Sequence, residues 1–429
     1  MRIERIEWDG FDPARLAGRL RSLVPAFSDV TDEVTRIVEG VREGGDAALR
    51  EIAERLGEEM PESFRVDPEA VAAAPGLLEP DVREALRVAA RNVETVARAE
   101  VDARTRPAGV ELPEGQLVEV RDEPVAAAGI YAPGGRGAYP SSVLMCCIPA
   151  RVAGVARICV ASPPGAAGRP NAAVLAACAA AGVDEVYSIS GAQAIAALAL
   201  GTETVSRVDL VAGPGNRYVT EAKRLLSATV GIDGIAGPSE LMVVADGTAR
   251  PDWIALDLCA QAEHGDDTLL VVASPDAALL DRLEELVTEL ADERPTVAHA
   301  PLALVASRGL EGALTLSDYL APEHLELMFQ GADETAARAR VAGCVFVGGG
   351  GATAFGDYAA GSNHVLPTGG AARFGGPLGP GTFRRRAAVV TIPRSAATAL
   401  APRVIALSGA EGFPVHGESA GARGRSAEG

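Results

Sequence analysis

Lysine is nearly absent from this chain, because only Lys223 among the 39 basic residues is a lysine. Aromatic residues make up 4% of a sequence that is 48% hydrophobic, so the core must be built from alanine, valine, leucine and isoleucine. The formal net charge is −19. So acidic a surface argues against nucleic acids and anionic membranes as partners, since both require concentrated positive charge.

Long hydrophobic runs and paired cysteines are also lacking. No run of about 18 apolar residues occurs, and the charged start MRIERIEWDG has no apolar segment of the kind that a signal peptide contains. None of the six cysteines forms a C-x-x-C pair. We therefore expect reduced, buried thiols in a cytoplasmic protein, and neither a disulfide framework nor a thiolate zinc site.

The hydrophobic pattern changes along the chain. Apolar positions at helical spacing predict helices over 31–56 and 80–104. From about residue 125, short β-branched runs alternate with alanine-rich runs at the spacing of βαβ units. Such near-continuous apolar strands are typical of parallel sheets covered on both faces, so we expect an α/β protein with two sheets. The predicted strands are 125–132, 157–162, 185–190, 207–213, 240–246, 268–274 and 343–349.

Three predicted strands end in glycine-rich turns. These turns are Tyr131-Ala-Pro-Gly-Gly-Arg-Gly, Ser190-Gly-Ala-Gln193 and Ala212-Gly-Pro-Gly-Asn216. Glycine lets the backbone approach a ligand, and the helix N-terminus that follows attracts an anion such as a dinucleotide pyrophosphate. However, neither G-x-G-x-x-G nor a P-loop occurs in the chain. From local sequence alone, a purely structural role in tight turns is the favoured interpretation.

Histidine gives a sharper signal. Four of the five histidines lie beside carboxylates or amides: His264, His324, His364 and His416. Gln261 and His264 are three residues apart near the end of a helix predicted over 251–264, so they share a face, and Asp357 can add an anionic ligand. Nitrogen and oxygen donors without thiolates fit zinc, with manganese or cobalt as alternatives. The residues alone support a metal site and a structural role about equally.

Glu323 and His324 form an adjacent acid–base pair after a proline. A neutral histidine is a suitable base near pH 7, and a carboxylate can activate water. Taken alone, the pair is better interpreted as a surface turn. No G-x-S-x-G or H-E-x-x-H pattern supports a serine or thermolysin-like mechanism.

Eight sequence blocks closely resemble the histidinol dehydrogenase family, in family order from about residue 20 to 420. They are GIYAPGGRGAYPSSVLM, ISGAQAIAALALGTETV, GPGNRYVTEAKR, IAGPSELMVVAD, QAEHGDD, YLAPEHLEL, FGDYAAGSNHVLPT and EGFPVHGES. The chain departs from the family pattern at Cys146, Cys259, the Gly348–Gly351 loop and PLGPGTFRRR. None of these departures falls on a ligand that the resemblance implies.

The resemblance implies an enzyme that oxidises L-histidinol to L-histidine in two NAD-dependent steps, through an aldehyde. It further implies a zinc-dependent homodimer with two Rossmann-like domains and a C-terminal helical tail that reaches the partner subunit. The implied organisation is an N-terminal helical segment (1–30), a first α/β domain with the substrate and zinc site (31–130 and 235–380), a second domain on the NAD side (131–234) and the tail (381–429).

Residue roles also follow from the resemblance. Zinc would be held by Gln261, His264, Asp357 and His416, the last from the other subunit. The zinc ligands, Glu323 and His324 would surround the substrate together with Ser239, His364 and Glu411. NAD would be contacted by Tyr131, Gln193 and Asn216. His324 would be the base in both oxidations, and Glu323 would activate the water that hydrates the aldehyde.

Three other functions remain as alternatives. A related zinc- and NAD-dependent dehydrogenase of another small polar alcohol is the nearest, but Glu411 and His416 are both present at the family spacing, which favours histidinol. A zinc hydrolase would leave the three glycine turns without a role. A non-catalytic ligand-binding module would not need the pair of Glu323 and His324.

Overall fold

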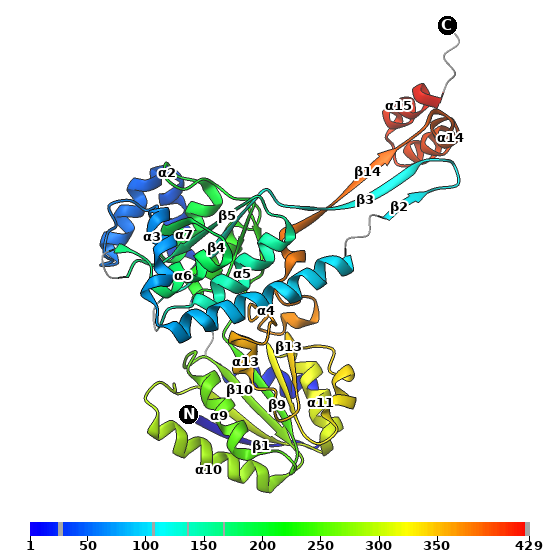
Figure 1. Ribbon diagram of the computed structural model, residues 1–429. Helices are drawn as coiled ribbons and strands as arrows, with labels where there is room; N and C mark the ends of the chain where they lie inside the picture. The colour runs from blue at the N-terminus through cyan, green and yellow to red at the C-terminus, as the bar shows by residue number, and fades with distance from the viewer. Residues whose placement is uncertain (25–28, 105–107, 135–136, 166–167, 425–429) are drawn as a thin grey trace. The chain divides into compact units, whose positions relative to one another are not determined.

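The computed structural model describes residues 1–24, 29–104, 108–134, 137–165 and 168–424. The chain divides into two compact units, residues 1–99 with 126–383 and residues 100–125 with 384–429. The larger unit contains two parallel sheets with helices packed on their faces (Figure 1). Among the described residues, no helix is long and apolar enough to cross a membrane.

The first sheet has six parallel strands in the order β1-β11-β10-β9-β12-β13. Two of its strands, β9 and β10, are buried along their whole length, which explains their continuous apolar sequence. Helices α1 and α11 cover one face, and α9 and α10 cover the other. The strands are β1 (Arg2–Glu7), β9 (Glu240–Ala245), β10 (Leu269–Ser274), β11 (Pro301–Ala306), β12 (His324–Met328) and β13 (Cys344–Val347). The helices are α1 (Pro13–Arg21), α9 (Pro251–Ala262), α10 (Ala277–Glu293), α11 (Gly309–Leu320), α12 (Ala332–Thr335) and α13 (Thr353–Tyr358).

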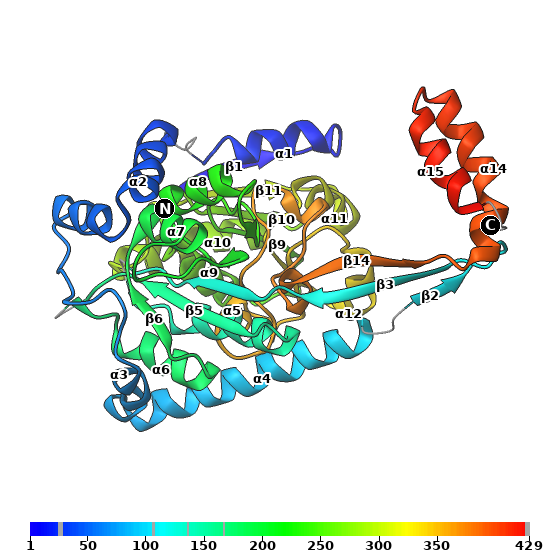
Figure 2. The ribbon, with the colours of Figure 1, turned by 90° about the horizontal axis from the view of Figure 1, so that it is seen from above.

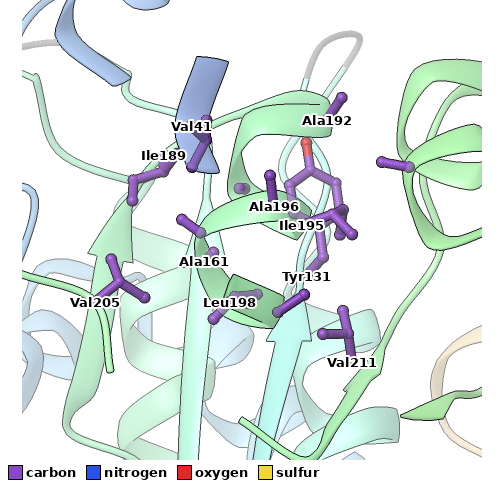
Figure 3. Packing of buried hydrophobic residues seen from close by; sticks show 14 of the residues in the cluster. Val41, Tyr131, Ala161, Ile189, Ala192, Ile195, Ala196, Leu198, Val205 and Val211 are labelled. Carbon is purple, nitrogen blue, oxygen red and sulfur yellow. The ribbon is translucent and has the colours of Figure 1, made fainter. Parts of the chain in front are cut away.

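The second sheet has five parallel strands in the order β6-β5-β4-β7-β8. Figure 3 shows Ile195 and Leu198 of α7 packed against side chains of these strands, with Val41 of α2 alongside. The strands are β4 (Ala127–Tyr131), β5 (Arg157–Ser162), β6 (Glu185–Ser188), β7 (Leu210–Ala212) and β8 (Gly231–Ile232). The helices of this part of the unit are α2 (Thr31–Arg55), α3 (Pro68–Ala73), α5 (Pro140–Ala153), α6 (Ala172–Ala181), α7 (Gly191–Leu200) and α8 (Arg217–Leu226). The helix predicted over 80–104 is α4 (Pro80–Arg104).

All seven predicted strands are present, and the fold class of parallel α/β sheets is confirmed. The segment 1–30 was predicted to be helical, but it begins with β1 in the first sheet. Residues 31–55 were assigned to the first domain, whereas α2 packs into the core of the second sheet. The cause of the first error is that β1 is an edge strand, in which charged and apolar residues mix.

The smaller unit is a β-ribbon that leads into a helical hairpin. β14 (Arg384–Thr391) pairs antiparallel with β3 (Leu117–Pro124), and β2 (Ala108–Glu111) pairs with the other edge of β3 (Figure 2). Helix α14 (Arg394–Ala410) packs against α15 (Pro414–Gly424). The tail predicted to be helical over 381–429 thus contains a strand, β14, and is helical in α14 and α15.

Candidate functional site

The candidate site of the first sheet lies at the amino ends of its strands. His324 is the first residue of β12, and it pairs in register with Leu241 near the start of β9. Ser239 immediately precedes β9, and His264 lies in the turn before β10. In contrast, the three glycine turns follow the carboxyl ends of β4, β6 and β7 in the second sheet. The two sheets thus present opposite strand ends to their candidate sites.

Glu323 and His324 are buried, with 6% and 4% of their surface exposed, and do not form the surface turn that their local sequence favours. Glu323 Oε2 accepts a hydrogen bond of 2.8 Å from the backbone N–H of Glu240. His324 Nδ1 lies 3.2 Å from the carbonyl oxygen of Glu240 and 3.5 Å from Glu323 Oε2. When Nδ1 donates to that carbonyl, the neutral ring carries its lone pair on Nε2, the atom that a base uses.

The surroundings of His324 favour its protonated form. Burial alone would lower the pKa of His324, but Glu323 and, to a smaller extent, Asp357 outweigh burial and raise the pKa to about 9. The Nε2 atom lies 3.8 Å from Asp357 Oδ1, and the ring stacks on Phe346 with 6.0 Å between centroids. The imidazole is therefore held between carboxylates in a fixed orientation.

A second buried carboxylate, Glu240, supports this pair and was missed by sequence reasoning. Its side chain accepts hydrogen bonds from the Arg21 guanidinium and from the backbone N–H of Gly369. Burial raises the pKa of Glu240, and Arg21 opposes that effect. An acidic residue at the start of an apolar strand was the available signal, but nothing local points to Arg21, which lies on α1.

His364 joins the two halves of the larger unit. Its Nδ1 lies 2.9 Å from the carbonyl oxygen of Asp357, and its Nε2 lies 3.0 Å from the Ser142 hydroxyl on α5. Burial lowers the pKa of His364, so the ring is neutral at pH 7. Next to it, Asn363 Nδ2 donates to the carbonyl oxygen of Met145 at 2.6 Å. Ser142 was not identified from the sequence, because a serine inside an apolar helix carries no distinctive pattern.

One of the predicted metal ligands, Gln261, has a side-chain polar atom without a partner among the described residues. Gln261 is 1% exposed, and its side-chain nitrogen has no hydrogen-bond partner among the described residues. Since the amide can be placed in either orientation, either of its polar atoms can face that position. His264 follows one turn later at the exposed end of α9, and α13, which carries Asp357, packs against α9. The nitrogen and oxygen donors suit zinc.

The ligand set is not complete within the described part of one chain. In these residues, no group of three or more His, Cys, Asp or Glu side chains is able to hold a metal ion. The implied set contains a glutamine amide and takes His416 from elsewhere. Glu411 and His416 lie on the helical hairpin of the smaller unit, where both are exposed.

The residues expected at NAD occupy the glycine turns. Tyr131 is buried at the end of β4, and its hydroxyl accepts a 2.9 Å hydrogen bond from the backbone N–H of Gly191. Burial raises the pKa of Tyr131 to about 12. Gln193 Nε2 donates to Ser190 Oγ at 2.8 Å. Asn216 caps α8, because its Oδ1 accepts hydrogen bonds from the backbone N–H groups of Tyr218 and Val219. Of the first predicted turn, residues 135–136 lie outside the described chain.

A cavity of about 440 Å³ is lined both by residues at the glycine turn after β7 and by residues at the amino ends of the first sheet's strands. Asn216 and Thr220, at the start of α8, line it together with Ser239, His264 and Asp267 from the first sheet's side. Residues expected to contact NAD, substrate and metal therefore face one space. Tyr131 and Gln193 do not line this cavity; they form the neighbouring turn instead.

A buried acid–base pair and a cavity walled by a glycine turn at the carboxyl edge of a parallel sheet place the chain among α/β enzymes that bind a ligand at this edge. The sequence model of the family described as Histidinol dehydrogenase matches residues 23–424. The chain belongs to the histidinol dehydrogenase family. It is an NAD-dependent oxidoreductase with the activity of that family.

Known relatives cover almost the whole chain. Histidinol dehydrogenase from Rhodospirillum rubrum is 43% identical, with 96% of this chain and 98% of the relative aligned. The enzyme from Thermobifida fusca is 41% identical over 98% of this chain and 97% of the relative. The crystal structure of histidinol dehydrogenase from Elizabethkingia anophelis matches with a TM-score of 0.88 and 29% identity, covering 99% of this chain and 98% of that one.

Proposed function

We propose that the chain oxidises L-histidinol to L-histidine in two NAD-dependent steps through an aldehyde, with Glu323 and His324 as the acid–base pair. The observation that carries this proposal is the burial of both side chains at the amino end of β12, where the Glu240 carbonyl fixes His324 Nδ1 and leaves Nε2 of the deprotonated ring to act as a base. Because the pKa of His324 is raised to about 9, the fraction of enzyme in this base form grows as the pH rises towards 9. The nearby cavity supports the proposal, because Asn216 lines it together with Ser239 and His264.

The proposed metal ligands are Gln261, His264 and Asp357, with His416 supplied by a second copy of the chain. The unpartnered amide of buried Gln261 supports this assignment, as does the packing of α13 on α9. Zinc bound there would supply a Lewis acid that anchors the imidazole and amine of histidinol.

The acid–base pair handles the protons of the reaction. In the first step His324 Nε2 takes the hydroxyl proton while the carbinol carbon gives up a hydride to NAD, which leaves the aldehyde. Glu323 then takes a proton from the water that adds to the aldehyde carbon, while the protonated His324 returns its proton to the aldehyde oxygen, so the hydrate forms and the His324 ring is neutral again. In the second step His324 takes a hydroxyl proton of the hydrate as a second hydride leaves for NAD. The carboxylic acid that results loses its remaining proton to water, which gives the carboxylate of histidine, with two NADH formed.

The remaining contacts are assigned to substrate and cofactor. Ser239 and His364 are placed against the substrate with Glu411 from the second copy; the position of Ser239 in the cavity and the neutral ring of His364 support this. Tyr131, Gln193 and Asn216 are placed on the NAD side. Because Tyr131 and Gln193 bond to their own turn, their role is to shape the backbone that meets the cofactor.

A homodimer with shared sites is part of the proposal. Exposed apolar side chains of the ribbon and hairpin, which include Val390, Leu407, Phe413 and Val415, provide a surface for a second copy. We place the enzyme in the cytoplasm, where its six free cysteines, five of them buried, stay reduced.

The test is the number of NADH molecules formed per L-histidinol consumed, before and after chelation. Two NADH per substrate, abolished by the chelator and restored by zinc, is the expected result. No NADH from histidinol with zinc-loaded dimer, but NADH from another small polar alcohol, would instead support the related dehydrogenase. A hydrolase or a binding module would reduce no NAD with any alcohol.

A further inference from the structure

The only lysine of the chain is buried in the second sheet. Lys223 lies on α8 with 3% of its surface exposed, and its Nζ is 2.6 Å from the carbonyl oxygen of Gly213. The same Nζ is 2.6 Å from Asp233 Oδ1. Asp233 Oδ2 accepts the backbone N–H of Gly213 at 2.7 Å. One ion pair therefore binds both backbone polar groups of a single residue.

Gly213 stands where the chain leaves β7 and passes close to the end of β4. Its φ of +116° is in the region that favours glycine, and an added Cβ would overlap the carbonyl oxygen of Tyr131. The residues that follow it, Gly215 and Asn216, line the cavity. The conformation of Gly213 thus sets where this wall of the cavity lies.

Composition does not explain why a lysine stands here. All the other 38 basic residues are arginine. The single lysine therefore indicates that a guanidinium is not suitable at position 223. Position 223 requires a compact ammonium whose donors reach one carbonyl and one carboxylate in a closed space, since the two paired side chains are only 4% and 5% exposed. A planar guanidinium is longer and its donors have a fixed geometry.

We propose that Lys223 and Asp233 are positioning residues that clamp the Gly213 peptide groups and thereby hold the 214–216 turn in the geometry that binds NAD. This inference rests on the proposed contact between Asn216 and the cofactor. The clamp touches neither the acid–base pair nor the proposed metal ligands.

The test uses the full-length, zinc-loaded protein with Lys223→Met, which keeps an unbranched side chain one atom shorter and removes its charge and donors. Calorimetry gives the Kd of NAD and of histidinol, and amide hydrogen exchange reports on residues 210–216. We expect NAD binding to weaken about tenfold or more through misplacement of the turn, and exchange in the turn to accelerate. Zinc content and histidinol binding should not change.

Two further variants define the controls. Arg224→Met on the same helix removes an exposed cation that pairs with Glu221, and it should leave NAD binding and turn exchange unchanged. Lys223→Arg should behave like Lys223→Met if the compact ammonium is what matters. Should Lys223→Met fail to fold, Asp233→Asn, which keeps an acceptor for the Gly213 N–H, gives the same two readouts.

The outcomes separate the clamp from the cofactor assignment. If Asn216→Ala weakens NAD binding while Lys223→Met changes neither NAD binding nor turn exchange, the clamp is wrong and the cofactor site stands. If Lys223→Met accelerates exchange but neither variant affects NAD binding, the placement of NAD at this turn is wrong, and with it the functional part of the inference.

Discussion

His364 Nε2 and the hydroxyl oxygen of Ser142 lie 3.0 Å apart and connect the segment after α13 with helix α5. The other ring nitrogen, Nδ1, lies 2.9 Å from the carbonyl oxygen of Asp357, so it must carry the proton, and Nε2 must accept from the serine. The neutral ring is thereby held at both nitrogens, and its position depends on both halves of the larger unit.

Ser142→Ala removes the donor to His364 and should weaken histidinol binding about fivefold, the size of one buried hydrogen bond. Zinc content should remain that of the unchanged protein. Steady-state KM and metal analysis measure the two effects. Ser141→Ala, the neighbouring and more exposed serine, is the control. An unchanged KM for histidinol in Ser142→Ala would show that this hydrogen bond does not position the substrate contact.

His324→Ala should lower kcat by about 10²-fold or more, because the proton acceptor is lost, while zinc stays bound. His264→Ala should instead release zinc. Metal analysis of both dialysed variants, beside their turnover, measures the difference. Release of zinc from His324→Ala would contradict the division of roles between base and ligand.

Mixing two inactive variants tests the shared site. His416→Ala subunits carry an intact acid–base pair, and His324→Ala subunits carry an intact tail. Heterodimers should therefore regain one complete site in two, and so recover part of the activity. The measurement is turnover in isolated heterodimers, and two homodimer preparations mixed without exchange are the control. No recovery in verified heterodimers would count against a tail that serves the partner.

Arg21→Met should destabilise the fold by about 3 kcal/mol, because it leaves the Glu240 carboxylate buried without its cation. Chemical denaturation measures this loss. Arg19→Met on the same helix breaks an exposed pair with Glu4 and should cost less than about 1 kcal/mol. Adding Glu240→Gln to Arg21→Met should restore part of the stability; equal losses in the two single arginine variants would argue against a buried ion pair.

Glu326 gives a pH-dependent prediction. Burial, and then the nearby carboxyl of Asp257, raise the pKa of Glu326 to about 8. The folded state therefore binds a proton that the unfolded chain releases above about pH 4.3, so stability falls as pH rises from there towards 8. Glu326→Gln keeps an acceptor for the backbone N–H of Thr353 and removes this loss. Between pH 5 and 8, the melting temperature of Glu326→Gln should rise relative to that of the unchanged protein. A difference in melting temperature that does not vary with pH would contradict a buried, protonated carboxyl.

The sequence predicted β9 and β10, which are buried throughout and have continuous apolar sequences. β11 is also apolar and almost entirely buried, but it was not predicted. β12 was not predicted, because His324 and Glu326 place ionisable groups at buried positions, against the usual pattern of a strand. The compensating partners come from distant segments, such as the Glu240 carbonyl for His324 and the Thr353 N–H for Glu326, and no local pattern reports them.

The site residues were identifiable one by one, but their arrangement was not. The glycine turn before Asn216 follows the carboxyl end of β7, where a ligand of a parallel sheet is expected. In the first sheet the candidate residues Ser239, His264 and Glu323 instead lie just before the strands begin. Strand direction relative to the site depends on how two sheets come together, which the hydrophobic pattern along one chain does not encode.

The opposite strand ends also give the cavity a built-in electrical polarity. Helix α8 starts after Asn216, so the positive end of its dipole faces the space, whereas α9 ends beside His264 and presents its negative end to the same space. The first wall attracts an anion and the second a cation, each by about 0.3–1 kcal/mol. The backbone dipoles alone therefore give the two walls opposite charge preferences, before any side chain is considered.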